Sequence, residues 1–199
     1  MILLPLLCVS YLLGSIPAGF VMGKLKGIDV RSQGSGNVGA TNVYRVVGKL
    51  PGLVVLVVDV WKGWFPASVL GSLAAAHGAS SPATARILLG LAAVAGHIWN
   101  PFLNFKGGKG VAAALGVLLG LNPLLAAAAV GVWIAAAAAT RYVSVASVSA
   151  AVSAPFIMLL IGSPTAWILG GIAVALAITA RHRSNFLRLL HGEEHRLGR

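Results

Sequence analysis

Long apolar stretches separated by short polar ones run through the whole 199-residue chain. About 20 apolar residues in succession form a helix that crosses the ~30 Å hydrocarbon core of a bilayer. Such stretches lie at roughly 2–23, 52–76, 87–105, 110–122, 123–140, 143–162 and 164–180. The pattern predicts an all-α polytopic membrane protein of about seven transmembrane helices. Because only Asn122-Pro123 separates the short fourth stretch from the fifth, these two form either a helical hairpin or one broken helix.

Small residues gather on several of these stretches, including Gly116, Gly120 and the alanine runs 126–129 and 135–139. In lipid, helices associate through small residues that let their backbones approach closely. No soluble segment or linker interrupts the pattern. The sequence therefore predicts a single integral membrane domain over residues 1–199, with the first span retained and not cleaved as a signal peptide.

Composition narrows the class of protein further. Apolar residues make up 58% of the chain and charged residues only 10%, whereas a soluble domain carries roughly a quarter charged residues. The 15 Lys and Arg greatly exceed the 4 Asp and Glu, and 13 of the 15 fall on one side if the N-terminus lies outside. Because basic residues near span ends resist translocation, we expect N-out and C-in orientation. The surplus charge thus indicates topology, and no nucleic-acid partner is expected.

Three polar clusters on the predicted inner side are candidates for chemistry. The first, residues 34–45, contains Ser35, Asn37 and Arg45 among glycines whose spacing matches the dinucleotide fingerprint. That motif needs a preceding buried strand, which the polar segment 29–33 does not supply. We therefore reject a dinucleotide site.

The second cluster, residues 105–110, places Lys106, Gly107, Gly108 and Lys109 directly before a predicted helix. Glycines let consecutive backbone N–H groups face a ligand, and a helix N-terminus adds positive potential, so this pattern indicates an anion site. It is not a nucleotide-hydrolase loop, since Gly110 stands where Ser or Thr would bind magnesium. A basic turn that anchors two helices at the headgroups is the alternative interpretation.

The third cluster lies at residues 181–195, where His182, Asn185 and Arg188 recur every three residues and can share a helix face. A surface helix bound to anionic lipid headgroups is the alternative. His191, Glu194 and His195 match an inverted zinc signature, which we reject because no further acidic ligand lies nearby.

Two predicted spans also contain ionisable residues. Asp59 and Lys62 are neighbours on one helix face, and we expect them to pair with each other or with the inner loops, with a proton relay as the alternative. His97 is either an interhelical hydrogen-bonding group or a site residue.

The clusters supply hydrogen-bond donors and cations but scarcely any carboxylate. Such groups suit phosphate substrates and the stabilisation of an oxyanion or a phosphate leaving group. They do not suit two-carboxylate hydrolysis or a Ser-His-Asp triad. We expect neither a metal site nor a cofactor.

Taken together, the clusters resemble the acyl-phosphate-dependent glycerol-3-phosphate acyltransferases of bacterial phospholipid synthesis, the PlsY family. The matching residues are 34–45 for the first cluster and Gly96-His97 with 105–112 for the second. For the third they are Arg181, His182, Asn185, residues 188–190, Gly192 and Glu194. Two positions depart from the family pattern: Pro101 follows Gly-His one residue late, and Ala113 stands where Thr is common.

The resemblance implies transfer of a fatty acyl group from acyl phosphate to the 1-hydroxyl of glycerol 3-phosphate, releasing lysophosphatidate and inorganic phosphate. It implies a multi-pass protein of the bacterial inner membrane with a cytoplasmic site, with membrane lipids and these two substrates as partners and no protein partner evident. We assign Lys106, Gly107, Gly108 and Arg45 to glycerol phosphate. The acyl phosphate is assigned Ser35, Asn37, His182 and Asn185, with Ser144 and His97 as positioning residues.

Two questions stay open at this point. Ser35 acting as a nucleophile with His182 as its base would give an acyl-enzyme, whereas direct attack by the glycerol hydroxyl on the activated donor is the preferred route. The other functional classes that fit the composition are a small anion transporter, with Asp59 and Lys62 as gating charges, and a noncatalytic basic scaffold for acidic lipids.

Overall fold

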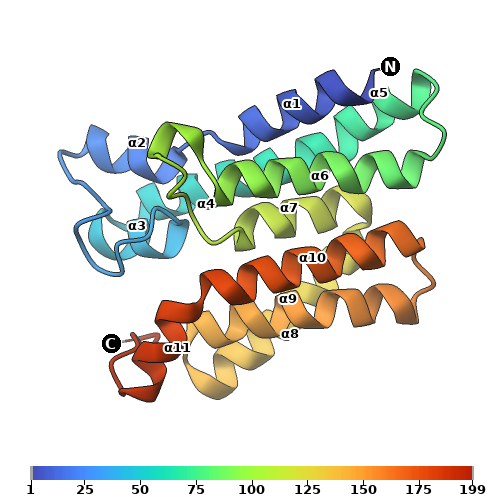
Figure 1. Cartoon of the computed structure of the whole chain (residues 1–199). Coiled ribbons are helices and arrows are strands. Elements are labelled where there is room, and N and C mark those ends of the chain that lie inside the picture. The colour runs from blue at the N-terminus through green and yellow to red at the C-terminus, as the bar shows by residue number, and fades with distance from the viewer. Residues whose placement is uncertain (1, 199) are drawn as a thin grey trace. The chain divides into compact units, whose positions relative to one another are not determined.

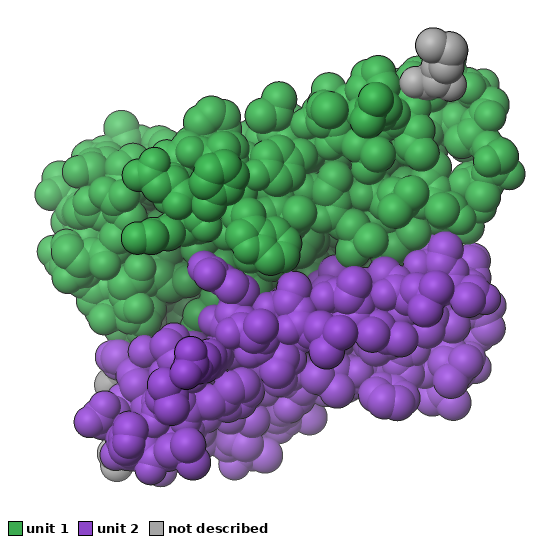
Figure 2. Space-filling model, in the orientation of Figure 1, with its two compact units in different colours: residues 1–121 green, residues 122–199 purple. Residues whose placement is uncertain are grey.

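Helices make up all the regular secondary structure in the computed structural model, which describes residues 2–198. The chain divides into two compact units, residues 1–121 and 122–199 (Figure 2). The first unit contains α1 (Leu3–Gly14), α2 (Ala18–Leu25), α3 (Ala40–Val46), α4 (Lys49–Phe65), the π-helix η1 (Pro66–Leu70), α5 (Gly71–Ala76), α6 (Pro82–Ile98), the 3-10 helix η2 (Pro101–Leu103) and α7 (Val111–Leu121). The second contains α8 (Pro123–Thr140), α9 (Val143–Leu160), α10 (Thr165–Arg181) and α11 (Arg183–Leu190).

Every predicted apolar stretch is helical over most of its length, which confirms the all-α prediction. Within residues 2–198, five segments are long and apolar enough to cross a membrane, namely Leu3–Leu25, Lys49–Ala76, Pro82–Leu103, Pro123–Thr140 and Val143–Leu160. The pair α10 and α11, bent by 49°, is a sixth if it forms one span. At 11 residues, α7 is shorter than each of these five candidate spans. The count of seven spans therefore stays a prediction.

Three local features differ from the predicted elements. The stretch 2–23 breaks between α1 and α2, where Pro17 lacks a backbone N–H to continue the helix. The stretch 87–105 begins earlier, at Pro82, and leaves the helix at Ile98, because Asn100 turns away to cap η2 by accepting a hydrogen bond from the Phe102 N–H at 3.0 Å. The polar segment before α4 contains the short helix α3, which the pattern does not indicate.

Glycines set the close packing of the first unit, where α1 packs against α6 and α4 against α7. A Cβ atom on Gly14 would lie 2.0 Å from the Ala93 carbonyl oxygen, and one on Gly116 would lie 1.9 Å from that of Val60. Both distances are far below van der Waals contact, so only glycine fits. The predicted role of Gly116 in close helix approach is confirmed.

A small apolar core joins the first two polar clusters within the first unit. Val30, Val38, Val43, Val55 and Leu103 pack together, so the α2–α3 loop, α3, α4 and η2 meet at one end of this unit (Figure 1). In the second unit, α9 packs against both α8 and α10. Each unit therefore presents its polar loops from a rigid helical base.

Candidate functional site

Asn42 organises the loop that carries Ser35. The Asn42 Oδ1 accepts a hydrogen bond from the Ser35 N–H at 2.8 Å. Its amide nitrogen donates to the carbonyls of Val30 at 3.0 Å and Gln33 at 3.1 Å. The residue is only 3% exposed, so a buried amide ties both arms of the loop and leaves the Ser35 side chain half-buried. Asn42 is not among the predicted site residues, although it lies inside the first cluster.

Asn37 and Arg45 lie at opposite ends of α3, Asn37 just before the helix begins and Arg45 in its last turn. The Asn37 Oδ1 accepts a hydrogen bond from the Gly39 N–H at 2.8 Å, immediately before the helix begins. Arg45 lies in the last turn of α3 and is exposed. The first cluster thus presents an exposed cation beside a loop that its own asparagines hold in shape.

The 106–110 loop uses its glycines differently from the prediction. The Gly107 N–H donates to the Ile98 carbonyl at 3.1 Å, and the Gly108 N–H donates to the His97 carbonyl at 3.0 Å. The expectation that these two N–H groups face a bound anion is therefore wrong, since both bond the end of α6. Glycine is required for another reason: a Cβ at position 107 would lie 2.1 Å from the His97 carbonyl oxygen.

The backbone just before this loop turns sharply. Asn104 and Phe105 have φ angles of 51° and 59°, in the left-handed region that non-glycine residues rarely adopt. Two such residues in succession reverse the chain after η2 and leave Lys106 exposed. The cation of the second cluster is therefore carried on a strained but well-anchored turn.

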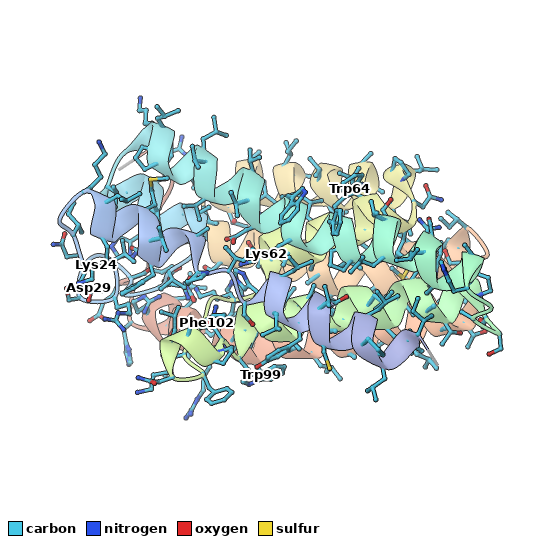
Figure 3. The ribbon with its side chains drawn as sticks, turned by 90° about the horizontal axis from the view of Figure 1, so that it is seen from above. Lys24, Asp29, Lys62, Trp64, Trp99 and Phe102 are labelled. Atoms are coloured by element: carbon cyan, nitrogen blue, oxygen red, sulfur yellow. The ribbon has the colours of Figure 1, made fainter. Side chains whose placement is uncertain are left out.

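Asp59 and Lys62 form the ion pair that the sequence predicts. Lys62 Nζ lies 2.8 Å from Asp59 Oδ1, and the two side chains are 2% and 3% exposed. The Lys62 ammonium also donates to the Ile16 carbonyl at 3.0 Å, at the break between α1 and α2. Lys62 lies in the interior of the first unit, whereas Lys24 and Asp29 lie at its end (Figure 3). His97 Nδ1 lies 3.7 Å from the same Asp59 oxygen.

In the second unit, Glu194 lies among residues of α9 and α11. Asn185 Nδ2 donates to Glu194 Oε1 at 2.6 Å, and Arg188 Nε donates to Oε2 at 2.9 Å. Although burial of the carboxylate opposes it, the hydrogen bonds from Asn185 and Arg188, together with the nearby Ser144 hydroxyl, hold the pKa of Glu194 below its ordinary value. Ser144 and Asn185, both predicted site residues, are thus brought together by a carboxylate outside the predicted site.

His182 lies at the bend between α10 and α11 and is 2% exposed. Its Nδ1 lies 2.8 Å from the Ile178 carbonyl oxygen. A carbonyl oxygen only accepts hydrogen bonds, so Nδ1 carries a proton and, in the neutral ring, Nε2 is the basic nitrogen. The second unit therefore holds an imidazole of fixed orientation close along the chain to Asn185.

The carboxylates of the chain are largely neutralised by internal cations. Hydrogen bonds from Arg31 hold the pKa of Asp29 well below its usual range, Asp59 pairs with Lys62, and Glu194 with Arg188. In the described part of the chain, Arg45 and Lys106 take part in no ion pair. These exposed cations remain to balance the charge of an external anion.

Comparisons with known proteins agree with this arrangement. A family model described as glycerol-3-phosphate acyltransferase matches residues 4–192, which include the first two clusters and residues 181–192 of the third. The chain belongs to the glycerol-3-phosphate acyltransferase family. A family member from Trichlorobacter lovleyi is 44% identical over 185 residues, covering 93% of this chain and 92% of that protein.

Two crystal structures share the fold of the present chain. One is described as the glycerol 3-phosphate form of PlsY (YgiH), an integral membrane glycerol 3-phosphate acyltransferase. It superposes with a TM-score of 0.92 at 43% identity, covering 100% of this chain and 96% of the other. The lysophosphatidic acid form of the same protein gives a TM-score of 0.89 with the same identity and coverage. The chain is thus an all-helical integral membrane protein of the PlsY-like fold.

Proposed function

We propose that this protein transfers a fatty acyl group from acyl phosphate to the 1-hydroxyl of glycerol 3-phosphate, the first acylation of bacterial phospholipid synthesis. The products are lysophosphatidate and inorganic phosphate. The observation that supports this most directly is the full-length similarity to a structure described as a glycerol 3-phosphate form. Both proposed substrates are phosphates, in keeping with the exposed, unpaired Arg45 and Lys106.

In the proposed step, the glycerol oxygen forms a bond to the acyl carbonyl carbon, and the bond from that carbon to the phosphate oxygen breaks. The hydroxyl proton passes to the departing phosphate, so atoms and charges balance without a strong protein base. An acyl phosphate is already activated, which favours direct transfer over an acyl-Ser35 intermediate. Donors aimed at the carbonyl oxygen would stabilise the charge that develops on it.

The residue roles are assigned within each unit. In the first, Lys106 and Arg45 bind the phosphate of glycerol 3-phosphate, while Gly107 and Gly108 shape the loop that presents Lys106. Ser35 and Asn37 belong to the acyl phosphate site, and His97 positions the glycine loop. In the second unit, His182 and Asn185 belong to the acyl phosphate site. Ser144 is a positioning residue there.

The activity assay uses the purified protein with acyl phosphate and radiolabelled glycerol 3-phosphate. We expect labelled lysophosphatidate from acyl phosphate and none from acyl-CoA. If neither donor gives labelled product, the proposed function is wrong. Trapping acylated Ser35 as a chemically competent intermediate would instead replace direct transfer by the two-step route.

We also propose that residues 1–199 form one domain of seven spans in the bacterial inner membrane, with the N-terminus outside and the site cytoplasmic. The positive-inside rule supports this orientation. Cys8 is the only cysteine, so a Cys8→Ser background allows single probes at the exposed positions Ser80 and Glu193. In intact cells, a membrane-impermeant thiol reagent should label Ser80→Cys and spare Glu193→Cys. The opposite labelling would reverse the proposed topology.

A further inference from the structure

A buried ion pair in the first unit has no part in the acyl-transfer chemistry proposed above. Placing an ionised side chain inside a membrane segment is costly, and such residues tend to be functional. The chain has only 4 acidic residues, and Asp59 is one of them. Neighbouring helices of the same unit reach close contact through glycines, so close packing there does not require charges.

The contacts of Asp59 lead directly to the loop that carries Lys106. Asp59 Oδ1 lies 2.8 Å from Lys62 Nζ and 3.7 Å from His97 Nδ1. The other ring nitrogen of His97 faces Gly108, because a Cβ there would lie 2.1 Å from Nε2. The Gly108 N–H also donates to the His97 carbonyl at 3.0 Å. The imidazole therefore lies between the carboxylate and the glycine loop.

Electrostatics determines which way this ring points. A carboxylate beside Nδ1 favours the proton on Nδ1 in either charge state of the ring, much as carboxylates orient histidines that bind metals. Lys62 balances the charge of Asp59, so His97 need not be cationic to compensate it. A carboxamide at position 59 would offer both a donor and an acceptor and would lose this preference.

We propose that Asp59 is a positioning residue for glycerol 3-phosphate: it orients His97, and His97 holds the 106–110 loop so that Lys106 meets the substrate phosphate. Lys62 pairs with the carboxylate at 2.8 Å and fixes its place in the interior of the unit. The inference rests on the proposed function, because it requires Lys106 to bind glycerol 3-phosphate.

The test compares three variants with wild type in the acyl phosphate assay. Asp59→Asn/Lys62→Met removes both charges, so neither is left buried alone. His97→Asn shortens the contact to Gly108 and keeps the ion pair. The third variant combines all these changes. Arg86→Met is the matched control, because Arg86 is another cation within a helix of this unit, donating to the carbonyls of Ala67 and Gly120 near the opposite end of α6.

We expect KM for glycerol 3-phosphate to rise about tenfold or more in each of the first two variants, with KM for acyl phosphate within about twofold of wild type. Since both changes act through one route, the combined variant should be no worse than the more impaired of the two. Arg86→Met should lower Tm and leave both KM values unchanged.

A wild-type KM for glycerol 3-phosphate in the ion-pair variant or in His97→Asn overturns the inference, as does full additivity in the combined variant. If the ion-pair variant is not recovered folded, Asp59→Asn takes its place, because the carboxamide keeps the size of the side chain but loses the preference that orients His97; an unchanged KM for glycerol 3-phosphate in that variant overturns the inference. Turnover by wild type with unaffected variants refutes only this inference, whereas absence of turnover by wild type overturns the proposed function together with it.

Discussion

Replacing Gly108 by alanine tests the contact that the glycine loop makes with His97. The added Cβ would lie 2.1 Å from Nε2 and 2.9 Å from Cε1 of the imidazole. Ordinary contact begins at 3.4 Å, so the loop and the ring must separate by more than about 1 Å in a close-packed interior. The ring has little freedom to retreat, since its Nδ1 side faces the buried Asp59.

Two effects of different size follow from this displacement. Overpacking a buried site costs about 1–3 kcal/mol of stability, and a misplacement of about 1 Å at a substrate-positioning group costs roughly 100-fold in rate. We therefore expect Gly108→Ala to lower kcat/KM for glycerol 3-phosphate by about 10- to 100-fold. The loss of folded protein should be much smaller than the loss of activity.

The measurement is kcat/KM for glycerol 3-phosphate at saturating acyl phosphate, together with Tm in the same detergent. Gly131→Ala is the matched control, because a Cβ at Gly131, inside α8, would meet nothing within 4 Å. Alanine there should leave activity unchanged and favour the helix slightly. A Gly108→Ala protein with kcat/KM and Tm equal to those of Gly131→Ala would refute the reasoning, since the loop would then accept a side chain without moving.

Three further predictions concern other parts of the site. Asn42→Ala removes the partner of the Ser35 N–H, so we expect the free energy of unfolding, measured by thermal unfolding, to fall by about 1–3 kcal/mol and KM for acyl phosphate to rise. An unchanged KM would show that Ser35 does not belong to the acyl phosphate site. Lys106→Ala should severely lower kcat/KM for glycerol 3-phosphate while Lys26→Ala, at another exposed lysine, does not; equal effects would indicate a general charge requirement. Because the folded pKa of Glu194 lies below its ordinary 4.5, its stabilisation is present above pH 4.5 and is lost as the pH falls through the lower folded value. Hydrogen exchange of residues 191–197 should report this loss, and Glu194→Gln should abolish its pH dependence.

The helical elements follow closely from the sequence wherever a local signal marks their ends. The stretch predicted at 123–140 coincides with α8, because Asn122 caps the helix by accepting from the Leu124 N–H at 2.9 Å and Pro123 suits its first turn. The end of α6 at Ile98 is different. Asn100 leaves the helix to donate to the Ser15 carbonyl at 2.7 Å, a contact between distant segments that local hydropathy does not reveal.

In the candidate site, too, local sequence signals predict some features, whereas others depend on contacts between distant segments. The glycines of residues 107–110 indicate that the backbone packs closely against another group. That group can be a bound anion or another part of the protein. The distances to His97 decide for packing at Gly107 and Gly108. The sequence marks Glu194 only within a rejected zinc signature and a family motif, yet the rarity of carboxylates is a further signal, because each one in so basic a chain needs a reason to be there.

That rarity bears on the proposed chemistry. Asp29, Asp59 and Glu194 are each engaged by cations of the chain itself, so none of these three is a spare general base. The remaining acid, Glu193, is exposed in the C-terminal tail. With no spare carboxylate, the proton acceptor is either an imidazole such as that of His182 or the phosphate released from an acyl phosphate, and the released phosphate accepts the proton without any help from the chain. Within residues 2–198, the same scarcity leaves Arg45 and Lys106 without an ion-pair partner, so a substrate phosphate meets these cations without first displacing one of the carboxylates described there. The charge balance of the chain therefore supports phosphate substrates for this site, and it is consistent with a direct transfer in which the departing phosphate takes the proton.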